Sequence, residues 1–274
     1  MTSARSEIQH AAWAESSPVV ELFKESAVIS WMELKKLLRD PTELLSRGVQ
    51  PVLWLVIFGQ VFTRVRGIPS GNVSYLAFMT PGILAQSVLF TGIFYGIAVI
   101  WERDLGIVHK LLVSPAYRAS LALGKAAAAG FRGVVQTVII YLIAIALGIS
   151  IRWKVPEILG VIAAVAAGSA IFSMFSLAIA CVVKSRERFM GIGQVLTMPL
   201  FFASNAIYPL SLMPNWLRIV SLINPLTYLV DALRRLMIQG GQSVHGLLLD
   251  FAVLVVVFVA LITLAAKLYP TLVR

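Results

Sequence analysis

The sequence predicts an all-α protein that crosses a membrane several times. Hydrophobic residues make up 59% of its 274 residues and charged residues only 13%, and the mean hydropathy is +0.87. Soluble globular domains carry about twice that share of charged residues. The apolar residues gather in runs of about 20, the length at which an α-helix crosses the hydrocarbon core of a bilayer. We therefore expect one polytopic domain.

Charge and cysteine content narrow the functional classes. The formal net charge is +10, but the basic residues lie mostly between apolar runs, where they meet lipid headgroups, so we expect no nucleic-acid partner. The single cysteine, Cys181, lies in an apolar run and is expected to pack there, which excludes an intrachain disulfide and a cysteine metal cluster. The first forty residues contain five glutamates and no early apolar core, so no cleavable signal is expected.

Six stretches can be drawn as membrane spans. They are residues 44–63, 78–101, 126–149, 158–183, 189–207 and 247–268. The first is the least secure, because its uninterrupted apolar part covers only about 21 Å at a rise of 1.5 Å per residue. It has to recruit the turn at Leu44 and Leu45, with Arg47 reaching the headgroups.

The distribution of Lys and Arg predicts the orientation. They are about twice as numerous before the first span, in the second-to-third and fourth-to-fifth connections and at the C-terminus as in the other connections. The positive-inside rule places both termini in the cytoplasm, and we expect a bacterial cytoplasmic membrane. The expected organisation is a cytosolic segment, 1–43, followed by a six-span domain, 44–274.

An amphipathic helix is predicted before the first span, from about residue 18 to residue 40. Its apolar residues repeat at the spacing of one helical face and its basic residues lie off that face. The face comprises Val20, Phe23, Ala27, Trp31, Leu34 and Leu38, and the basic residues are Lys24, Lys35, Lys36 and Arg39. The helix is too polar to span, so we expect it in the cytoplasmic headgroup region. A folded-back or partner-bound cytosolic helix is the alternative.

The segment after the fifth span is apolar but repeatedly broken by proline. Pro209, Pro214 and Pro225 interrupt it, so it is neither an ordinary exposed loop nor one continuous span. Broken helices inside a membrane are tolerated where their free backbone groups are buried in protein or face water. We expect a re-entrant external hairpin over residues 208–241.

The connection between the second and third spans, residues 102–124, has a distinctive order. It begins with the charged run Glu102, Arg103 and Asp104, continues through a short apolar-faced helix containing Leu111 and Leu112, and is broken by Ser114 and Pro115. A Gly124-Lys125 pair then enters the third span. An ordinary interfacial loop is the alternative reading of this stretch.

Together, the hairpin, this connection and the opening helix resemble the permease family of type-2 ABC exporters, over nearly the whole chain. The resemblance implies that residues 102–124 form a cytosolic coupling segment that contacts an ATPase, through Glu102, Arg103, Asp104, Leu111, Leu112, Ser114 and Pro115. It also implies a second permease copy, which we expect to be identical, and two ATPase subunits per complex. Membrane lipids are the remaining expected partners.

The chain contains no phosphate-binding loop of the form Gly-x-x-x-x-Gly-Lys-Ser/Thr. Gly124-Lys125-Ala126 follows no predicted strand and lacks the hydroxyl residue. We therefore expect no enzymatic activity from this chain alone and no cofactor in it. ATP and Mg²⁺ would be bound by the separate ATPase.

Polar residues within spans suggest a transport path. In the fifth span, Gln194, Thr197, Phe201, Ser204 and Asn205 share one helical face. In the second, Gln86 and Phe90 lie on one face, and Ser87, Thr91 and Tyr95 on an adjoining one. The resemblance implies that these two spans line the substrate cavity, which makes Gln86, Phe90, Tyr95, Gln194, Thr197, Phe201, Ser204 and Asn205 the candidates. Alternatively, these side chains only hydrogen-bond neighbouring helices, at about 0.6 to 2 kcal/mol each.

Other residues favour structural roles. Arg132 lies about 10 Å into the third span and is expected to snorkel or to pair with Glu102 or Asp104. Asp231 is spaced to meet Arg234 or Arg235. Gly92 and Gly96 are expected to allow close helix packing. No metal ligands are predicted, because the three histidines are scattered along the chain.

The leading hypothesis is an ATP-driven exporter subunit that moves an amphipathic small molecule, a lipid or a lipid-linked glycan. An ion-coupled secondary transporter is the alternative, but no Asp or Glu lies centrally in any predicted span. A membrane-embedded enzyme is a third possibility, which the scattered histidines disfavour. The aromatic second and fifth spans favour an amphipathic substrate over a hydrophilic polymer.

Overall fold

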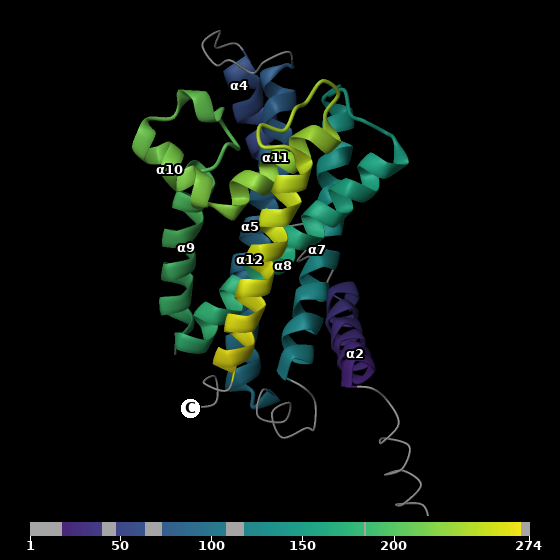
Figure 1. Cartoon of the computed structure of the whole chain (residues 1–274), viewed down its shortest axis with the longest axis vertical. Helices are drawn as coiled ribbons and strands as arrows, with labels where there is room; N and C mark the ends of the chain where they lie inside the picture. The colour runs from purple at the N-terminus through teal and green to yellow at the C-terminus, as the bar shows by residue number, and fades with distance from the viewer. Residues whose placement is uncertain (1–17, 40–47, 64–72, 108–117, 184, 270–274) are drawn as a thin grey trace, which may run out of the picture.

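The computed structural model describes residues 18–39, 48–63, 73–107, 118–183 and 185–269, which form a bundle of α-helices (Figure 1). In chain order these are α2 (Pro18–Arg39), the apolar helix Gly48–Phe62 with its π-helical turn η1 (Trp54–Gly59) and end α4 (Gln60–Thr63), α5 (Tyr75–Asp104), α7 (Arg118–Ala146), α8 (Val155–Val182), α9 (Arg186–Phe202), the 3-10 turn η2 (Leu210–Leu212), α10 (Asn215–Ile223), α11 (Pro225–Met237) and α12 (Leu247–Leu268). Figure 1 shows α2 beside the lower half of α7 and α4 at the opposite end. We call these the α2 end and the α4 end.

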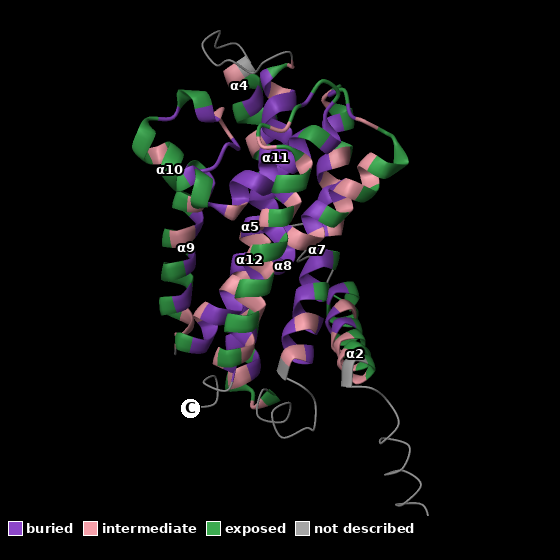
Figure 2. Cartoon of the chain, viewed as in Figure 1, coloured by how far each residue is buried: buried purple, intermediate pink, exposed green. Residues whose placement is uncertain are grey.

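Helices α5 and α8 form the centre of the bundle, and their contact depends on small residues. A Cβ atom on Gly92 would lie 2.6 Å from Phe172 Cβ, so the two backbones approach as closely as glycine allows. The Gly96 N–H donates to Ser176 Oγ at 2.9 Å. Most of α5 is buried, whereas much of α12 is exposed in this single chain (Figure 2). The packing role predicted for Gly92 and Gly96 is confirmed.

Four of the six predicted spans correspond to helices long and apolar enough to cross a membrane: Tyr75–Asp104, Ala119–Ala146, Val155–Val182 and Leu247–Leu268. The all-helical prediction is consistent with the described residues, which contain one isolated antiparallel bridge, between Ile151 and Ile238, and no longer strand. The first predicted span corresponds to the shorter apolar helix Gly48–Phe62. The fifth corresponds to α9, which has 17 residues and ends at Phe202.

The hairpin region folds as a chain of short helices. After α9, the turn η2 leads into α10 and α11, and Asn224 joins them by accepting from the Leu226 N–H at 3.0 Å while its own amide donates to the Leu200 carbonyl at 2.6 Å. The α11 helix is buried on most sides. This geometry packs α11 on the bundle, whereas most residues of α10 are exposed in this single chain. Its re-entry into a bilayer stays a prediction.

Helix α2 packs with its polar face inward. Ser30, Glu33 and Leu37 are buried, while Phe23, Trp31 and Leu38 on the predicted apolar face are more than half exposed. A Cβ atom on Gly124 of α7 would lie 2.6 Å from Ile29 Cβ, so α2 and α7 are in close contact. The exposed apolar face leaves α2 suited to lie against lipid.

Candidate functional site

A groove beside α5 contains two of the predicted path residues, Gln86 and Phe90. It has a volume of about 320 Å³, and it is lined by Gln50, Pro51, Gln86, Ser87, Phe90, Thr91 and Phe94. The two predicted faces of α5, one with Gln86 and one with Thr91, therefore border a single groove. Aromatic rings beside amide and hydroxyl groups are typical of sites for amphipathic molecules.

The predicted path residues on α9 have mixed environments. Gln194 is exposed, whereas Thr197, Phe201, Ser204 and Asn205 are buried. The Thr197 hydroxyl donates to the Gly193 carbonyl and the Ser204 hydroxyl to the Phe201 carbonyl, so both are satisfied within their own segment. The Phe201 ring lies 6.0 Å from the Trp54 ring, one turn beyond the groove residues Gln50 and Pro51. The first apolar helix therefore separates the groove from the end of α9.

Asn205 is the most unusual of these residues. Its backbone carbonyl accepts from Arg234 Nη2 at 2.6 Å, but both of its side-chain polar atoms are buried without a hydrogen-bond partner. A buried amide without partners is costly, so its two unpartnered polar atoms need an explanation.

Tyr95, a third path candidate on α5, lies apart from the groove in a buried charged network. This network joins α2, α5 and α7 through Glu33, Lys36, Tyr95, Glu102, Lys125 and Arg132. Lys125 Nζ lies 2.6 Å from Glu102 Oε2 and 3.6 Å from Glu33 Oε1. Lys36 Nζ lies 3.1 Å from Glu33 Oε1 and 2.8 Å from Glu102 Oε1. The Tyr95 ring lies under the Arg132 guanidinium, 4.7 Å from it.

Arg132 pairs with a residue that the sequence prediction did not consider. Its Nη2 lies 3.5 Å from Glu33 Oε2, rather than beside Glu102 or Asp104. The expected pairing is therefore wrong. Helix α2 packs against α7 with the Glu33 carboxylate facing Arg132, and Glu102 pairs with Lys125 instead. Arg132 Nε and Nη1 are buried and have no hydrogen-bond partner among the described residues.

The network strongly favours the ionised form of Glu33. Burial alone would raise the pKa of its carboxyl, but Lys125, Lys36 and Arg132 together lower that pKa to about 2. Burial also acts on Lys36, yet its contacts with Glu102 and Glu33 leave its pKa above the usual value. These charges therefore hold α2 on the bundle across the physiological pH range.

The predicted coupling residues Glu102, Arg103 and Asp104 form the last turn of α5. Glu102 points to the charged network, whereas Asp104 lies 3.0 Å from Arg103 Nη2 and 2.8 Å from Arg186 Nη2 at the start of α9. The Arg186 guanidinium also stacks 3.7 Å from the Trp101 ring. The end of α5 is thus tied to α2, α7 and α9 at once. Leu111, Leu112, Ser114 and Pro115 lie outside the described residues.

Two members of the charged network, Lys125 and Glu33, were not identified from the sequence. Helix α7 begins at Arg118, so Lys125 lies within it rather than marking its entry, and the buried role of Lys125 was missed. Glu33 was also missed, although it shares a helical face with Ser26 and Ser30 beside the apolar stripe. That row of polar residues was the signal that this side of the helix contacts polar groups of the protein.

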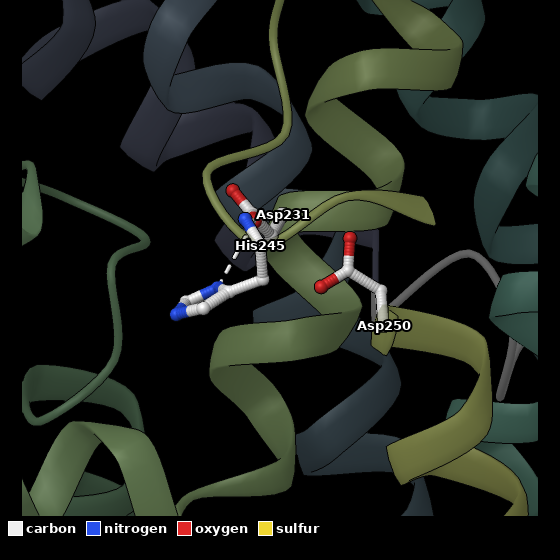
Figure 3. A group of neighbouring side chains, drawn as sticks. All are labelled: Asp231, His245 and Asp250. Atoms are coloured by element: carbon white, nitrogen blue, oxygen red, sulfur yellow. Dashed lines mark hydrogen bonds and ion pairs between the residues drawn. The ribbon is translucent and has the colours of Figure 1, made fainter. Parts of the chain in front are cut away.

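A third cluster, at the α4 end, contains the residues that could hold a metal ion. Among the described residues, Asp231 of α11, His245 in the following loop and Asp250 of α12 offer ligand atoms within 4.8 Å of one another (Figure 3). Asp231 Oδ1 also lies 3.9 Å from Arg234 Nη1, which confirms the predicted Asp231–Arg234 proximity.

Comparison with known proteins gives a consistent result. The ABC-2 type transporter family matches residues 25–238. The transport permease ycf38 of Cyanophora paradoxa is 31% identical over 80% of this chain and 77% of its own length. The doxorubicin resistance ABC transporter permease protein DrrC of Mycobacterium tuberculosis is 25% identical over 74% of this chain and 72% of its own.

A further relative is nodulation protein J of Rhizobium meliloti, 25% identical over 74% of this chain and 76% of its own length. The family match covers more than half of the chain and includes α5, α7, α8, α9 and α11, which carry the groove and most of the charged network. The chain is a multi-pass membrane protein that belongs to the ABC-2 type transporter family, as a permease subunit.

Proposed function

We propose that this chain is the transmembrane subunit of an ATP-driven exporter, and that two copies act with two ATPase subunits supplied as separate polypeptides. The ATPases would bind ATP and Mg²⁺. We place the complex in a bacterial cytoplasmic membrane with both termini of this chain in the cytoplasm, so that the α2 end is cytoplasmic. The family membership and the permease relatives support this proposal.

The observation that carries the proposal is the double role of α5. Its middle lines the groove through Gln86 and Phe90, and its last turn carries Glu102 and Asp104, which tie it to α2, α7 and α9. An ATPase that moves the segment after α5 would therefore act on a helix that borders the groove. A rigid helix of 30 residues transmits such a displacement along its length.

The proposed substrate is an amphipathic small molecule, a lipid or a lipid-linked glycan. The groove contains two phenylalanine rings, with centroids 6.1 Å apart, beside the polar side chains of Gln86 and Thr91. Relatives named for doxorubicin resistance and for nodulation agree with a cargo of this general kind. Apolar contacts with the rings would supply most of the affinity and the polar groups its orientation.

The function is tested with the permease and its ATPase reconstituted in liposomes. Substrate-stimulated ATP hydrolysis and transport are measured together for Phe90→Ala and Thr91→Val in the groove, and for Val256→Ala on the exposed side of α12 as control. We expect the groove variants to raise the half-saturating substrate concentration about tenfold, which corresponds to about 1.4 kcal/mol of lost contact. Unchanged values in both groove variants would exclude this groove from the path.

The coupling role of α5 needs a variant that does not disturb the buried network. Asp104 and Arg186 suit this purpose, because their side chains are 36% and 33% exposed. We expect Asp104→Asn to leave assembly and basal ATP hydrolysis intact while lowering transport per ATP hydrolysed. Glu187→Gln, a nearby exposed carboxylate on α9, is the control. Equal transport per ATP in wild type and Asp104→Asn would show that this contact does not carry coupling.

A further inference from the structure

The cluster of Asp231, His245 and Asp250 draws side chains from three separate segments to one point at the α4 end (Figure 3). Asp231 and Asp250 are completely buried, and the His245 side chain is 15% exposed. Asp231 Oδ2 accepts the backbone N–H groups of Val244 and His245, at 2.7 and 3.0 Å. The loop before α12 is therefore wrapped around the Asp231 carboxylate.

The basic partners of the cluster lie on its Asp231 side. Arg234 Nη1 is 3.9 Å from Asp231 Oδ1, and His245 Nδ1 hydrogen-bonds Asp231 Oδ2 at 3.2 Å. Within the described part of the chain no Lys or Arg forms an ion pair with Asp250, and Asp250 Oδ1 and Asp231 Oδ1 are buried without a hydrogen-bond partner there. A buried carboxylate such as that of Asp250 is strongly unfavourable unless its charge is balanced. A bound cation would balance it.

The contacts of the Ser243 hydroxyl also indicate that the two carboxylates lack a positive group between them. Its Oγ lies 3.1 Å from Asp231 Oδ2 and 2.9 Å from Asp250 Oδ2, and it accepts the Gly246 N–H at 2.6 Å. A serine hydroxyl has one proton, so it can donate to only one of the two carboxylates. The contact of Ser243 Oγ with the other carboxylate oxygen is then repulsive unless a proton or a cation lies between them.

We propose that Asp231, His245 and Asp250 bind a divalent cation of the first transition row, for which Zn²⁺ is the appropriate probe. One imidazole nitrogen with two carboxylate oxygens is a set that such ions accept, at about 2.0 to 2.2 Å from each ligand atom. Three ligand atoms as much as 4.8 Å apart surround a centre about 2.8 Å from each, so each atom would move inward by about 0.6 to 0.8 Å to reach these distances. A water molecule would complete the coordination.

The surroundings suit this role. Each carboxylate has one oxygen without a hydrogen-bond partner among the described residues, so each has room for a further ligand. The backbone bonds from Val244 and His245 orient the Asp231 carboxylate, as outer-shell contacts do in metal sites. An open pocket of about 430 Å³ borders the same loop, and its wall includes Ser243 and Gly246 together with Arg152 and Arg235. The ion would fasten α11 to α12.

Zinc binding is measured on the purified full-length chain in detergent by equilibrium dialysis and elemental analysis. The background carries Cys181→Ala, His10→Gln and His109→Gln and a tag without histidine, so that no other thiol or imidazole contributes. We expect about one Zn²⁺ per chain, and affinity at least tenfold weaker in His245→Ala and in Asp250→Asn. Glu157→Gln, which removes another carboxylate at the same end, should bind as the parent does.

Thermal unfolding provides a second readout that does not depend on transport. Zinc should raise the unfolding midpoint of the parent chain and of Glu157→Gln, but not that of His245→Ala, and a tenfold excess of Mg²⁺ should not displace it. Equal zinc content in parent and His245→Ala, or loss of zinc in Glu157→Gln, would overturn the proposal. A parent chain that binds no zinc, with a pH dependence of the midpoint that Asp250→Asn abolishes, would assign the position to a proton instead and would also overturn the proposal.

Discussion

Lys125 Nζ lies 2.6 Å from Glu102 Oε2, and only 2% of the lysine side chain is exposed. This ion pair joins the second turn of α7 to the last turn of α5. Because Glu33 and Lys36 of α2 contact the same two residues, at 3.6 and 2.8 Å, three helices share one set of charges. Lys125 is the buried basic partner of both carboxylates, whereas the Lys36 side chain is 54% exposed.

The first prediction concerns that pair. Lys125→Met should destabilise the chain by about 3 to 5 kcal/mol, because Glu102 would stay buried with only the partly exposed Lys36. The unfolding midpoint in detergent should fall by on the order of 10 °C. Glu157→Gln, which breaks the more exposed Arg152–Glu157 pair, should cost about 1 kcal/mol. Similar midpoints for the two variants would contradict the buried network.

Glu33 gives the network a predictable pH dependence. Its pKa is lowered from 4.5 to about 2 in the folded chain, so ionised Glu33 stabilises the fold. That contribution is complete above pH 4.5 and is lost as the pH falls from 4.5 to about 2. The midpoint difference between wild type and Glu33→Gln should therefore be constant above pH 5 and should shrink below it. A midpoint difference that grows as the pH falls would contradict the stabilising role of ionised Glu33.

Helix packing at Gly92 can be tested with a matched glycine. A Cβ atom at Gly92 would lie 2.6 Å from Phe172 Cβ, whereas at Gly191 of α9 it would meet nothing within 4 Å. Gly92→Ala should lower the unfolding midpoint, at a cost of about 1 to 3 kcal/mol from overpacking. Gly191→Ala should be neutral or stabilising, since alanine favours helix by about 1 kcal/mol. Equal effects would mean that α5 and α8 are not in such close contact.

The proposed orientation predicts which positions react from outside the cell. In a background without Cys181, cysteines placed at Trp153 and Gln242, both exposed near the α4 end, should react with an impermeant thiol reagent in intact cells. A cysteine at Ser185, before α9, should react only after the membrane is opened. The reverse pattern would invert the topology. Reaction at position 153 but not at position 242 would place another crossing between α9 and α12.

The long apolar helices could be predicted from sequence because the bilayer imposes a strong compositional requirement. Residues of α5, α8 and α12 satisfy it without reference to the rest of the chain. The end of α5 and the start of α7 were harder to predict. Charged residues usually lie at the membrane edge, but Glu102 of α5 and Lys125 of α7 are buried because they pair with each other.

The charged network and the metal-binding cluster could not be predicted for a different reason. The first apolar helix and the whole of α5 lie between Glu33 and Lys125 in the sequence, and Asp231 lies in α11 whereas His245 lies in the irregular loop that follows. Nothing in local spacing indicates which long-range partner a charge will meet. The face of α5 that lines the groove was accessible to sequence reasoning, because helical periodicity places Gln86 and Phe90 on one side.

The loop that wraps Asp231 also bears on how the chain is made. The groups that bind this carboxylate, in Ser243, Val244 and His245, follow it by 12 to 14 residues. While α11 is already synthesised and those residues are not, Asp231 has only Arg234 as a neighbour of opposite charge. A chain that ended before residue 243 would therefore lack the hydroxyl and the two backbone N–H groups that bind Asp231, and α11 would depend on Arg234 alone to offset that buried carboxylate.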